Sequence, residues 1–297
     1  MLESQRNMPG QRETLSVLLV NDDGVSARGI VELARALSPR CIVTVVAPES
    51  PRSAASHSIT LHKPLRVRQV EGFPWPAETV AGCTAYSTSG SPADGTMLGV
   101  LEVLKDAPPH LVVSGINDGQ NLAEDVTYSG TVAGAMEGAI LGLPSIAVSL
   151  DSRGCGHFAT ASHCLIRLLG KLLYDRQPEG VWPAPDLEGA LLRSVFDGRR
   201  FLNINVPDLP VEEIKGIRSC YTGFRGYRDV VQKMVDPRGE PFYWIAGERV
   251  VEDLREGSDV KAASEGFVTV TPLTWDLTDR EGLALPSGAV DEDFSVD

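Results

Sequence analysis

Two consecutive carboxylates follow an apolar segment near the start of the chain. Residues 17–20 are all apolar, and after one asparagine they lead into Asp22 and Asp23, with Gly24 ending the run. Neighbouring carboxylates repel each other unless a proton or a cation lies between them. Carboxylate oxygens are hard ligands that suit Mg2+ or Mn2+. The pair therefore indicates a metal site, with a surface turn as the alternative because Asn, Asp and Gly are turn formers.

Two further segments place polar side chains directly after apolar runs. Residues 41–47 are followed by a loop rich in Ser, Pro and Ala that contains Ser53, and residues 111–113 are followed by a turn that contains Asn117. Ligands in open α/β sheets bind beyond the carboxyl ends of the strands, so we expect these groups near the aspartates. Carboxylate, hydroxyl and amide oxygens would together form an incomplete shell for a divalent cation.

A helix of small residues is predicted to begin at the Ser129-Gly130-Thr131 turn. A capping serine leaves free backbone N–H groups in the first helical turn, and these groups favour a bound anion. A hard cation facing an anion cradle implies phosphoryl chemistry, in which the metal acts as a Lewis acid and activates water.

The elements that must position these residues alternate between strands and helices. A β-α-β unit implies parallel strands with a right-handed crossover, and its repetition predicts an α/β fold with a doubly wound, mostly parallel sheet. Ser91, Pro92 and Asp94 are typical of a helix start. The predicted core strands are 17–20, 41–47, 111–113, 144–150 and 201–206, the shorter polar strands are 59–70 and 78–81, and the helices are 28–37, 92–105, one from about 131, and 157–174.

One domain is predicted over residues 15–275, between a disordered polar extension at 1–14 and an acidic tail at 276–297. Within it, residues 211–257 consist of short β-like stretches rich in aromatic residues. Aromatic residues are enriched in interface cores, so this region suits a β-hairpin arm that covers a partner subunit. A hairpin packed on its own domain is an equal alternative.

The composition excludes several classes of protein. A net charge of −13 and a pI near 4.9 argue against nucleic-acid binding, which needs basic patches. The sequence contains neither an apolar run long enough to span a membrane nor a signal-peptide core, so no membrane association is expected. Five scattered cysteines fit reduced thiols. We therefore expect a cytoplasmic protein.

Six motifs in this order and spacing make the chain resemble the SurE (survival protein E) family. They are NDDG, APESPRSAASHSIT, SGSPADGTMLGV, VVSGINDGQNLAEDVTYSGTVAGAMEG, LNINVP and FVTVTPL, and they lie between residues 17 and 273. The resemblance implies a Rossmann-like core with a C-terminal extension that swaps between subunits into homodimers or homotetramers. It also implies a metal-dependent 5'-nucleotidase, a phosphomonoesterase for nucleoside 5'-monophosphates, with 3'-nucleotides and short polyphosphate as further substrates.

The resemblance also implies roles for individual residues. One divalent ion per subunit, Mg2+ or Mn2+, would be bound by Asp22, Asp23, Ser53 and Asn117. Phosphate would lie near Asn21, Ser53, Ala54, Asn117, Ser129, Gly130 and Thr131. Catalysis would fall to Asp22, Asp23 and Asn117. Asp22 would orient or deprotonate the attacking water, and a covalent aspartyl-phosphate on the same carboxylate is the alternative.

Two positions depart from the family pattern. Ala54 stands where the family usually has glycine, and His57 stands where it usually has asparagine. These departures keep open a non-catalytic, metal-dependent nucleotide-binding module. A phosphatase of the haloacid dehalogenase type is disfavoured because it requires Asp-x-Asp, whereas Asp22 and Asp23 are adjacent.

Overall fold

A nine-stranded sheet forms the centre of the molecule in a computed structural model that describes residues 13–152, 156–174, 177–187, 195–228, 231–245 and 248–278. The strands of this sheet are β1 (Ser16–Val20), β2 (Ile42–Pro48), β3 (Val67–Gln69), β4 (Thr84–Thr88), β5 (Leu111–Asp118), β6 (Ser145–Asp151), β7 (Arg200–Pro207), β8 (Ile217–Ser219) and β13 (Val268–Thr274). Their order is β3-β4-β2-β1-β5-β6-β7-β13-β8.

The six strands from β4 to β7 in this order are parallel. β3 is antiparallel to β4, β13 is antiparallel to β7, and β8 pairs in parallel with β13. The chain passes from β1 outward to β2 and β4, and then returns to β5 on the other side of β1. The direction of winding therefore changes between β1 and β5, which is where open α/β sheets bind ligands. The predicted doubly wound, mostly parallel sheet is confirmed.

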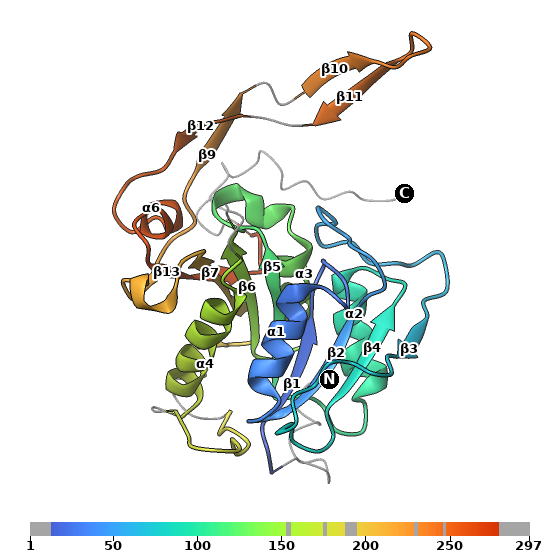
Figure 1. Ribbon diagram of the computed structural model, residues 1–297, viewed down its shortest axis with the longest axis vertical. Coiled ribbons are helices and arrows are strands. Elements are labelled where there is room, and N and C mark those ends of the chain that lie inside the picture. Colours follow the sequence, from blue (N-terminus) through green and yellow to red (C-terminus); the bar gives the residue numbers. More distant parts are fainter. Residues whose placement is uncertain are drawn as a thin grey trace, which may run out of the picture.

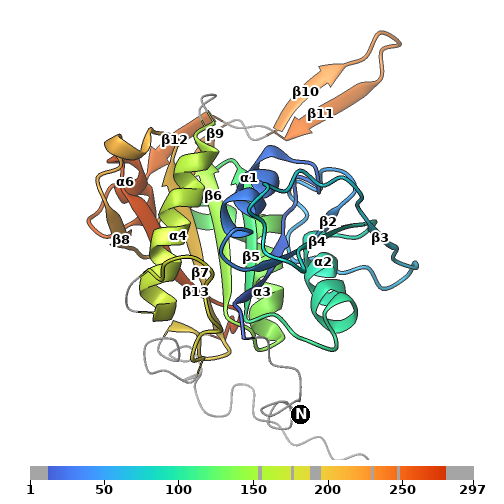
Figure 2. The same cartoon turned by 60° about the horizontal axis from the view of Figure 1, so that its bottom comes forward.

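Helices cover both faces of this sheet (Figure 1, Figure 2). α1 and α4 pack together on one face, and α2 and α3 pack together on the other. The helices are α1 (Arg28–Leu37), α2 (Pro92–Leu98), α3 (Gly130–Ile140), α4 (Phe158–Tyr174) and α6 (Asp259–Ser264), with short helical turns at η2 (Gly99–Val103), η3 (Ala123–Thr127) and η4 (Val211–Glu213).

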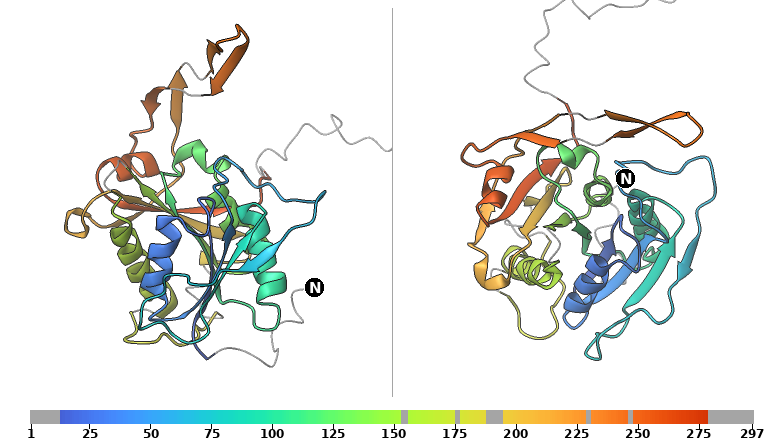
Figure 3. Two further views of the ribbon diagram at one scale, coloured as in Figure 1. Left: turned by 45° about the vertical axis from the view of Figure 1, so that its right-hand side comes forward. Right: turned by 45° about the horizontal axis from the view of Figure 1, so that its top comes forward.

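A long antiparallel arm projects from this body (Figure 1, Figure 3). Its base pairs β9 (Arg225–Arg228) with β12 (Glu248–Glu252), and its tip pairs β10 (Val231–Val235) with β11 (Pro241–Ile245). Every residue of β10 and β11 is exposed. Within the region predicted as the arm, about 211–257, β8 pairs with β13 as a strand of the main sheet, and the antiparallel ribbon that projects from the body consists of β9 to β12.

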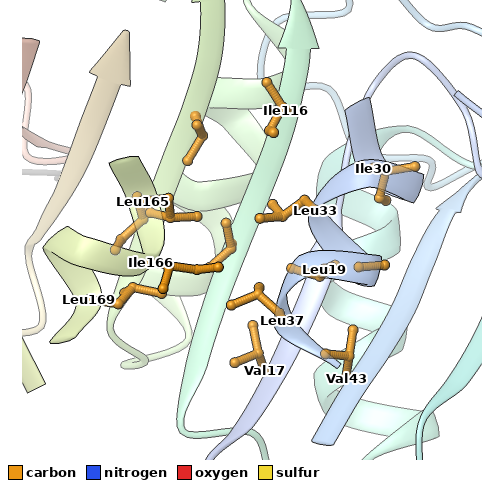
Figure 4. Packing of buried hydrophobic residues seen from close by; sticks show 14 of the residues in the cluster. Val17, Leu19, Ile30, Leu33, Leu37, Val43, Ile116, Leu165, Ile166 and Leu169 are labelled. Carbon is orange, nitrogen blue, oxygen red and sulfur yellow. The ribbon is translucent and has the colours of Figure 1, made fainter. Parts of the chain in front are cut away.

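Residues of β1 point alternately to the two layers, which explains why the strand is apolar throughout. Val17 and Leu19 belong to the cluster that α1 and α4 cover (Figure 4). Leu18 and Val20 belong to a second cluster with Val46 and its neighbours on the opposite face. A parallel strand that is buried on both faces has no polar side.

Two predicted strands are absent or shortened among the described residues. Residues 78–81 form no strand, since the chain turns at Gly82 with φ +93° and pairs with β2 only from Thr84. Of residues 59–70, only β3 is a strand. Side-chain bonds to Asp94, and not ladder bonds, hold Thr60.

The remaining elements follow the sequence closely. The predicted helix at 92–105 is α2 continued by the π-helical turn η2. The predicted extension at 1–14 lies outside the described residues up to residue 12, and within it Thr14 forms a β-bridge to Pro183. Of the predicted tail at 276–297, the structure describes residues 276–278. Within the described residues, no helix is long and apolar enough to cross a membrane.

Candidate active site

Three loops meet at the carboxyl edge of the sheet, where β2, β1 and β5 are neighbours. Backbone bonds join the loop after β1 to the loop after β2: Val25 N–H donates to Pro48 O over 2.9 Å, and Arg52 N–H donates to Asp22 O over 2.7 Å. On the other side, the N–H of Asp118 donates to Asp23 Oδ2 over 3.1 Å. These bonds bring together the segments that carry the two aspartates, Ser53 and Asn117.

Asn21 closes the turn that presents the aspartates. Its Nδ2 donates to Gly24 O over 3.0 Å, and its Oδ1 accepts from Gly24 N over 3.1 Å. Gly24 has φ +104°, a conformation that L side chains rarely adopt. The completely buried Asn21 side chain therefore holds the turn, and its predicted phosphate contact would have to be made in addition to these two bonds.

Asp22 lies against the first turn of α3. Thr131 Oγ1 donates to Asp22 Oδ1 over 2.7 Å, and Asp22 is only 4% exposed. A Cβ on Gly130 would approach Asp22 Cβ to 2.9 Å and Oδ2 to 3.0 Å, so the missing side chain allows this close approach. Ser129 caps the helix by accepting from Val132 N, as predicted. The carboxylate and the helix N-terminus thus form one site.

Burial shifts the pKa of both aspartates in the same direction. Desolvation raises the pKa of Asp22, and the hydrogen bond from Thr131 offsets part of this rise. Desolvation also raises the pKa of Asp23. The nearby charges of Asp22 and Asp118 raise it further, and the hydrogen bond from the Asp118 backbone offsets part of the rise. Removing a carboxylate from water disfavours its charged form unless a cation compensates.

Asn117 is half-buried and is the residue before Asp118, the last residue of β5, so it lies within the strand and not in the predicted turn. Its Nδ2 donates to Gly119 O over 2.8 Å. Because the nitrogen is used in this way, Oδ1 is the Asn117 atom that could coordinate a cation.

Ser53 lies on an exposed loop, which we call the serine loop (residues 49–60). Ala54 has φ +55° and Ser56 has φ +49°, both in the left-handed region. Ala54 thus keeps a conformation suited to glycine, so the loss of glycine has not prevented the left-handed turn. The loop is also tied to the segment before α3, because Ser56 N–H and Oγ donate to Tyr128 O and Thr127 O over 3.0 and 2.8 Å.

The donor set fits a hard divalent cation. It consists of oxygens, and the buried Asp22 and the half-buried Asp23 both have raised pKa values, so a positive charge would relieve an electrostatic penalty. Among the described residues, no group of three or more His, Cys, Asp or Glu side chains could hold a metal. A metal here would therefore need Ser53 or Asn117 in addition to the aspartates.

Two buried carboxylates support the site in ways that the sequence analysis did not predict, although it did assign Asp94 to a helix start. Asp94 accepts from Thr60 N and Oγ1 over 2.9 and 2.7 Å, which anchors the end of the serine loop to α2. Glu137 accepts from His57 Nε2 over 2.8 Å. The available signal for Glu137 was a single charge in a helix of otherwise small or apolar residues.

The family model for survival protein SurE matches residues 17–229. The chain belongs to the SurE family. It is 44% identical over 272 residues to 5'-nucleotidase SurE of Gloeobacter violaceus, covering 91% of this chain and 94% of that protein. It is 43% identical over 272 residues to 5'-nucleotidase SurE of Aeromonas hydrophila, covering 91% and 96%.

A crystal structure of SurE protein from Aquifex aeolicus has the same fold, with a TM-score of 0.70 at 39% identity, over 90% of this chain and 96% of that one. All of the predicted site residues lie within the part of the chain that the SurE family model matches. The loops that converge on Asp22 therefore belong to the shared family core and not to an appended segment.

Proposed function

We propose that this chain is a divalent-metal-dependent phosphomonoesterase that hydrolyses nucleoside 5'-monophosphates to nucleoside and phosphate. Membership of the SurE family and the names of its relatives, 5'-nucleotidase SurE, support the nucleotide substrate. The observation that carries the chemistry is the position of Asp22, whose buried carboxylate lies against the N-terminus of α3 and beside Asp23.

The backbone at the start of α3 would bind the phosphate group. Free N–H groups in the first turn of a helix favour an anion. The hydroxyl and the backbone N–H of Thr131 both interact with the Asp22 carboxylate, so any contact from Thr131 to phosphate would have to be made in addition to these interactions. Ser53 and Ala54 would approach the phosphate from the serine loop, and Asn117 from the end of β5.

Asp22, Asp23, Ser53 and Asn117 would hold the metal. When bound, Mg2+ or Mn2+ supplies Lewis-acid polarisation of the phosphate and lowers the pKa of a coordinated water. Asp22 would orient the attacking water or accept its proton through Oδ2, since the Thr131 hydroxyl bonds Oδ1. Incorporation of oxygen-18 into the carboxylate in a single turnover would instead indicate a covalent aspartyl-phosphate.

Phosphate release from AMP and GMP, measured with Mg2+, Mn2+ or EDTA, tests this function. We expect metal-dependent release that Asp22→Asn lowers by at least roughly 100-fold, because the carboxylate is both ligand and base. Asn keeps the Thr131 bond, so the fold should persist. Asp106→Asn, at an exposed site outside this edge, serves as the matched control.

Absence of release from every nucleotide, in a folded protein that still binds metal, would refute the enzyme and favour the nucleotide-binding module. Cleavage of 3'-nucleotides and short polyphosphate is a further proposal that the same assay tests. We also propose that the arm joins subunits into a homodimer or homotetramer.

A further inference from the structure

The serine loop has an unusual conformation that its own sequence does not stabilise. Ala54 and Ser56 both adopt positive φ angles. Such conformations are sparsely populated for residues other than glycine and persist only where surrounding contacts hold them. The contacts made by the middle of this loop therefore decide where Ser53 lies.

One of these contacts is a pair of side chains that joins the loop to α3. His57 Nε2 lies 2.8 Å from Glu137 Oε2. The Glu137 side chain is 8% exposed and the His57 side chain is 29% exposed. A buried carboxylate is stable only with a compensating partner. Loss of the contact with His57 would leave the Glu137 carboxylate without this partner.

The position of Glu137 separates this pair from the proposed phosphate position. Glu137 is six residues after Thr131 on the same helix, which corresponds to about 9 Å along its axis. An ionised Glu137 carboxylate can only accept a hydrogen bond, and Nε2 of His57 is then the donor between them. That nitrogen is therefore directed to the side of the helix and not to its N-terminus.

We propose that His57 and Glu137 form a latch that fixes the serine loop against the helix whose N-terminus binds the phosphate. His57 is a positioning residue in this arrangement and does not touch the substrate. The latch sets the distance between Ser53, on the loop, and the first turn of α3. Its effect on catalysis rests on the proposed function, whereas its effect on the loop does not.

Hydrogen–deuterium exchange of the protein without metal or nucleotide tests the latch directly. Two loop amides report on it, because Arg52 N–H and Ser56 N–H are bonded to Asp22 O and Tyr128 O. In His57→Ala we expect these amides to exchange roughly tenfold faster, as local opening becomes easier. The amides of α3 should not change. Unchanged protection at Arg52 and Ser56 would overturn the proposal.

Three variants make this measurement specific. His57→Asn should retain most of the protection, because an amide can still donate to Glu137. Glu137→Leu should loosen the loop as His57→Ala does, and the double variant should exchange no faster than either single one, since both remove the same interaction. His62→Ala, at an exposed histidine nearby, should match the wild type.

Steady-state kinetics separate a positioning role from a catalytic one. A loosened loop should raise KM for AMP roughly tenfold while kcat falls less than about threefold, with recovery in His57→Asn. A fall in kcat of about 100-fold that His57→Asn does not restore would instead assign acid–base catalysis to His57 and overturn the positioning role. If the wild type releases no phosphate, the proposed function fails, while the exchange result still decides the latch.

Discussion

Asp22 shows how one residue combines an unfavourable environment with a proposed function. Its carboxylate is buried next to a second carboxylate, and desolvation raises the pKa of both groups. A folded protein without metal must therefore stabilise two charges that its own side chains only partly compensate. Active sites retain such groups because function requires them, although substitutions that remove them commonly stabilise the fold.

The raised pKa values determine how stability should depend on pH in the metal-free protein. A carboxyl group whose pKa is raised on folding contributes stability that is complete below its unfolded pKa, near 3.8 here, and that is lost as pH rises through the folded pKa. In EDTA at pH 8 we therefore expect Asp22→Asn to require more urea for unfolding than the wild type. The difference should shrink toward pH 4.

Urea unfolding of both proteins at several pH values, with and without Mg2+, provides the measurement. With Mg2+ the order should reverse, because a ligand that binds only the folded wild type stabilises it. If Asp22→Asn is the less stable protein at pH 8 without metal, burial does not control the energetics of this carboxylate.

The contact between Gly130 and Asp22 explains why a glycine stands at position 130. An added Cβ would lie 2.9 Å from Asp22 Cβ and 3.1 Å from Pro92 Cγ, which is closer than real Cβ atoms normally approach. We expect Gly130→Ala to displace Asp22 and to lower kcat/KM by roughly 100-fold, since small displacements of catalytic groups have effects of this size.

The destabilisation caused by Gly130→Ala should be about 1–3 kcal/mol, as is usual for overpacking. Thermal unfolding and AMP hydrolysis measure the two effects. Gly72→Ala is the control for activity, because nothing lies within 4 Å of a Cβ built there; its φ of +69° is itself unfavourable for alanine, so it is not a control for stability. An equal loss of activity in both variants would contradict the proposed displacement.

At the scale of elements, α2 both begins with its own cap and anchors the serine loop. Asp94 accepts from Ser91 N to complete a capping box with Ser91, and it also accepts from Thr60 N and Oγ1. One carboxylate therefore fixes the helix start and the end of the loop that carries Ser53.

We expect Asp94→Ala to destabilise the protein by about 2–4 kcal/mol, because it removes a helix cap and leaves buried donors without an acceptor. Denaturant unfolding tests the magnitude, with Asp106→Ala as the exposed control. The loop bonds also predict a higher KM for AMP in Asp94→Ala. A loss below about 0.5 kcal/mol, typical of surface substitutions, would show that these bonds contribute little.

The base of the arm contacts the segment that connects Asn117 at the end of β5 with Ser129 at the start of α3. Arg225 is 3% exposed, and its guanidinium bonds Asp125 Oδ2 over 3.2 Å and Gln120 Oε1 over 2.9 Å. Both partners lie between Asn117 and Ser129. The base of the arm is thus integrated with the body, in contrast to its exposed tip.

At the scale of the whole molecule, the tip of the arm presents apolar surface to solvent. Its exposed large residues include Met234, Phe242, Tyr243, Trp244 and Ile245. Clusters of exposed apolar side chains commonly mark an interface. This supports the proposal that the arm covers a partner subunit.

Replacing residues 231–245 by a short Gly-Ser turn tests the arm. We expect the intact protein to have a mass in solution of two or four times 31.9 kDa. The shortened protein should contain fewer subunits, because the apolar tip is removed. Light scattering coupled to size exclusion measures both. The base strands remain, so the thermal transition of the body should persist. If both proteins contain the same number of subunits in solution, the arm tip is excluded as the contact between them.

Local patterns along the chain predicted most of the fold. The apolar run at 17–20 identified the central strand, and Ser91 and Ser129 identified two helix starts that the structure confirms. Capping and burial are encoded within a few residues, so a single sequence reveals them. The strand at β4 was missed because its sequence, Thr-Ala-Tyr-Ser-Thr, is mostly polar, and parallel pairing with β2 decides its conformation.

The order of strands and loops along the chain was enough to place Asp22, Asp23, Ser53 and Asn117 at one edge of a sheet. The bond of Asp22 to Thr131, 109 residues away, and that of His57 to Glu137, 80 residues away, became evident only from the folded structure. Such bonds depend on the packing of helices and loops against a common sheet. No pattern of neighbouring residues specifies that packing, because it arises from many distant contacts at once.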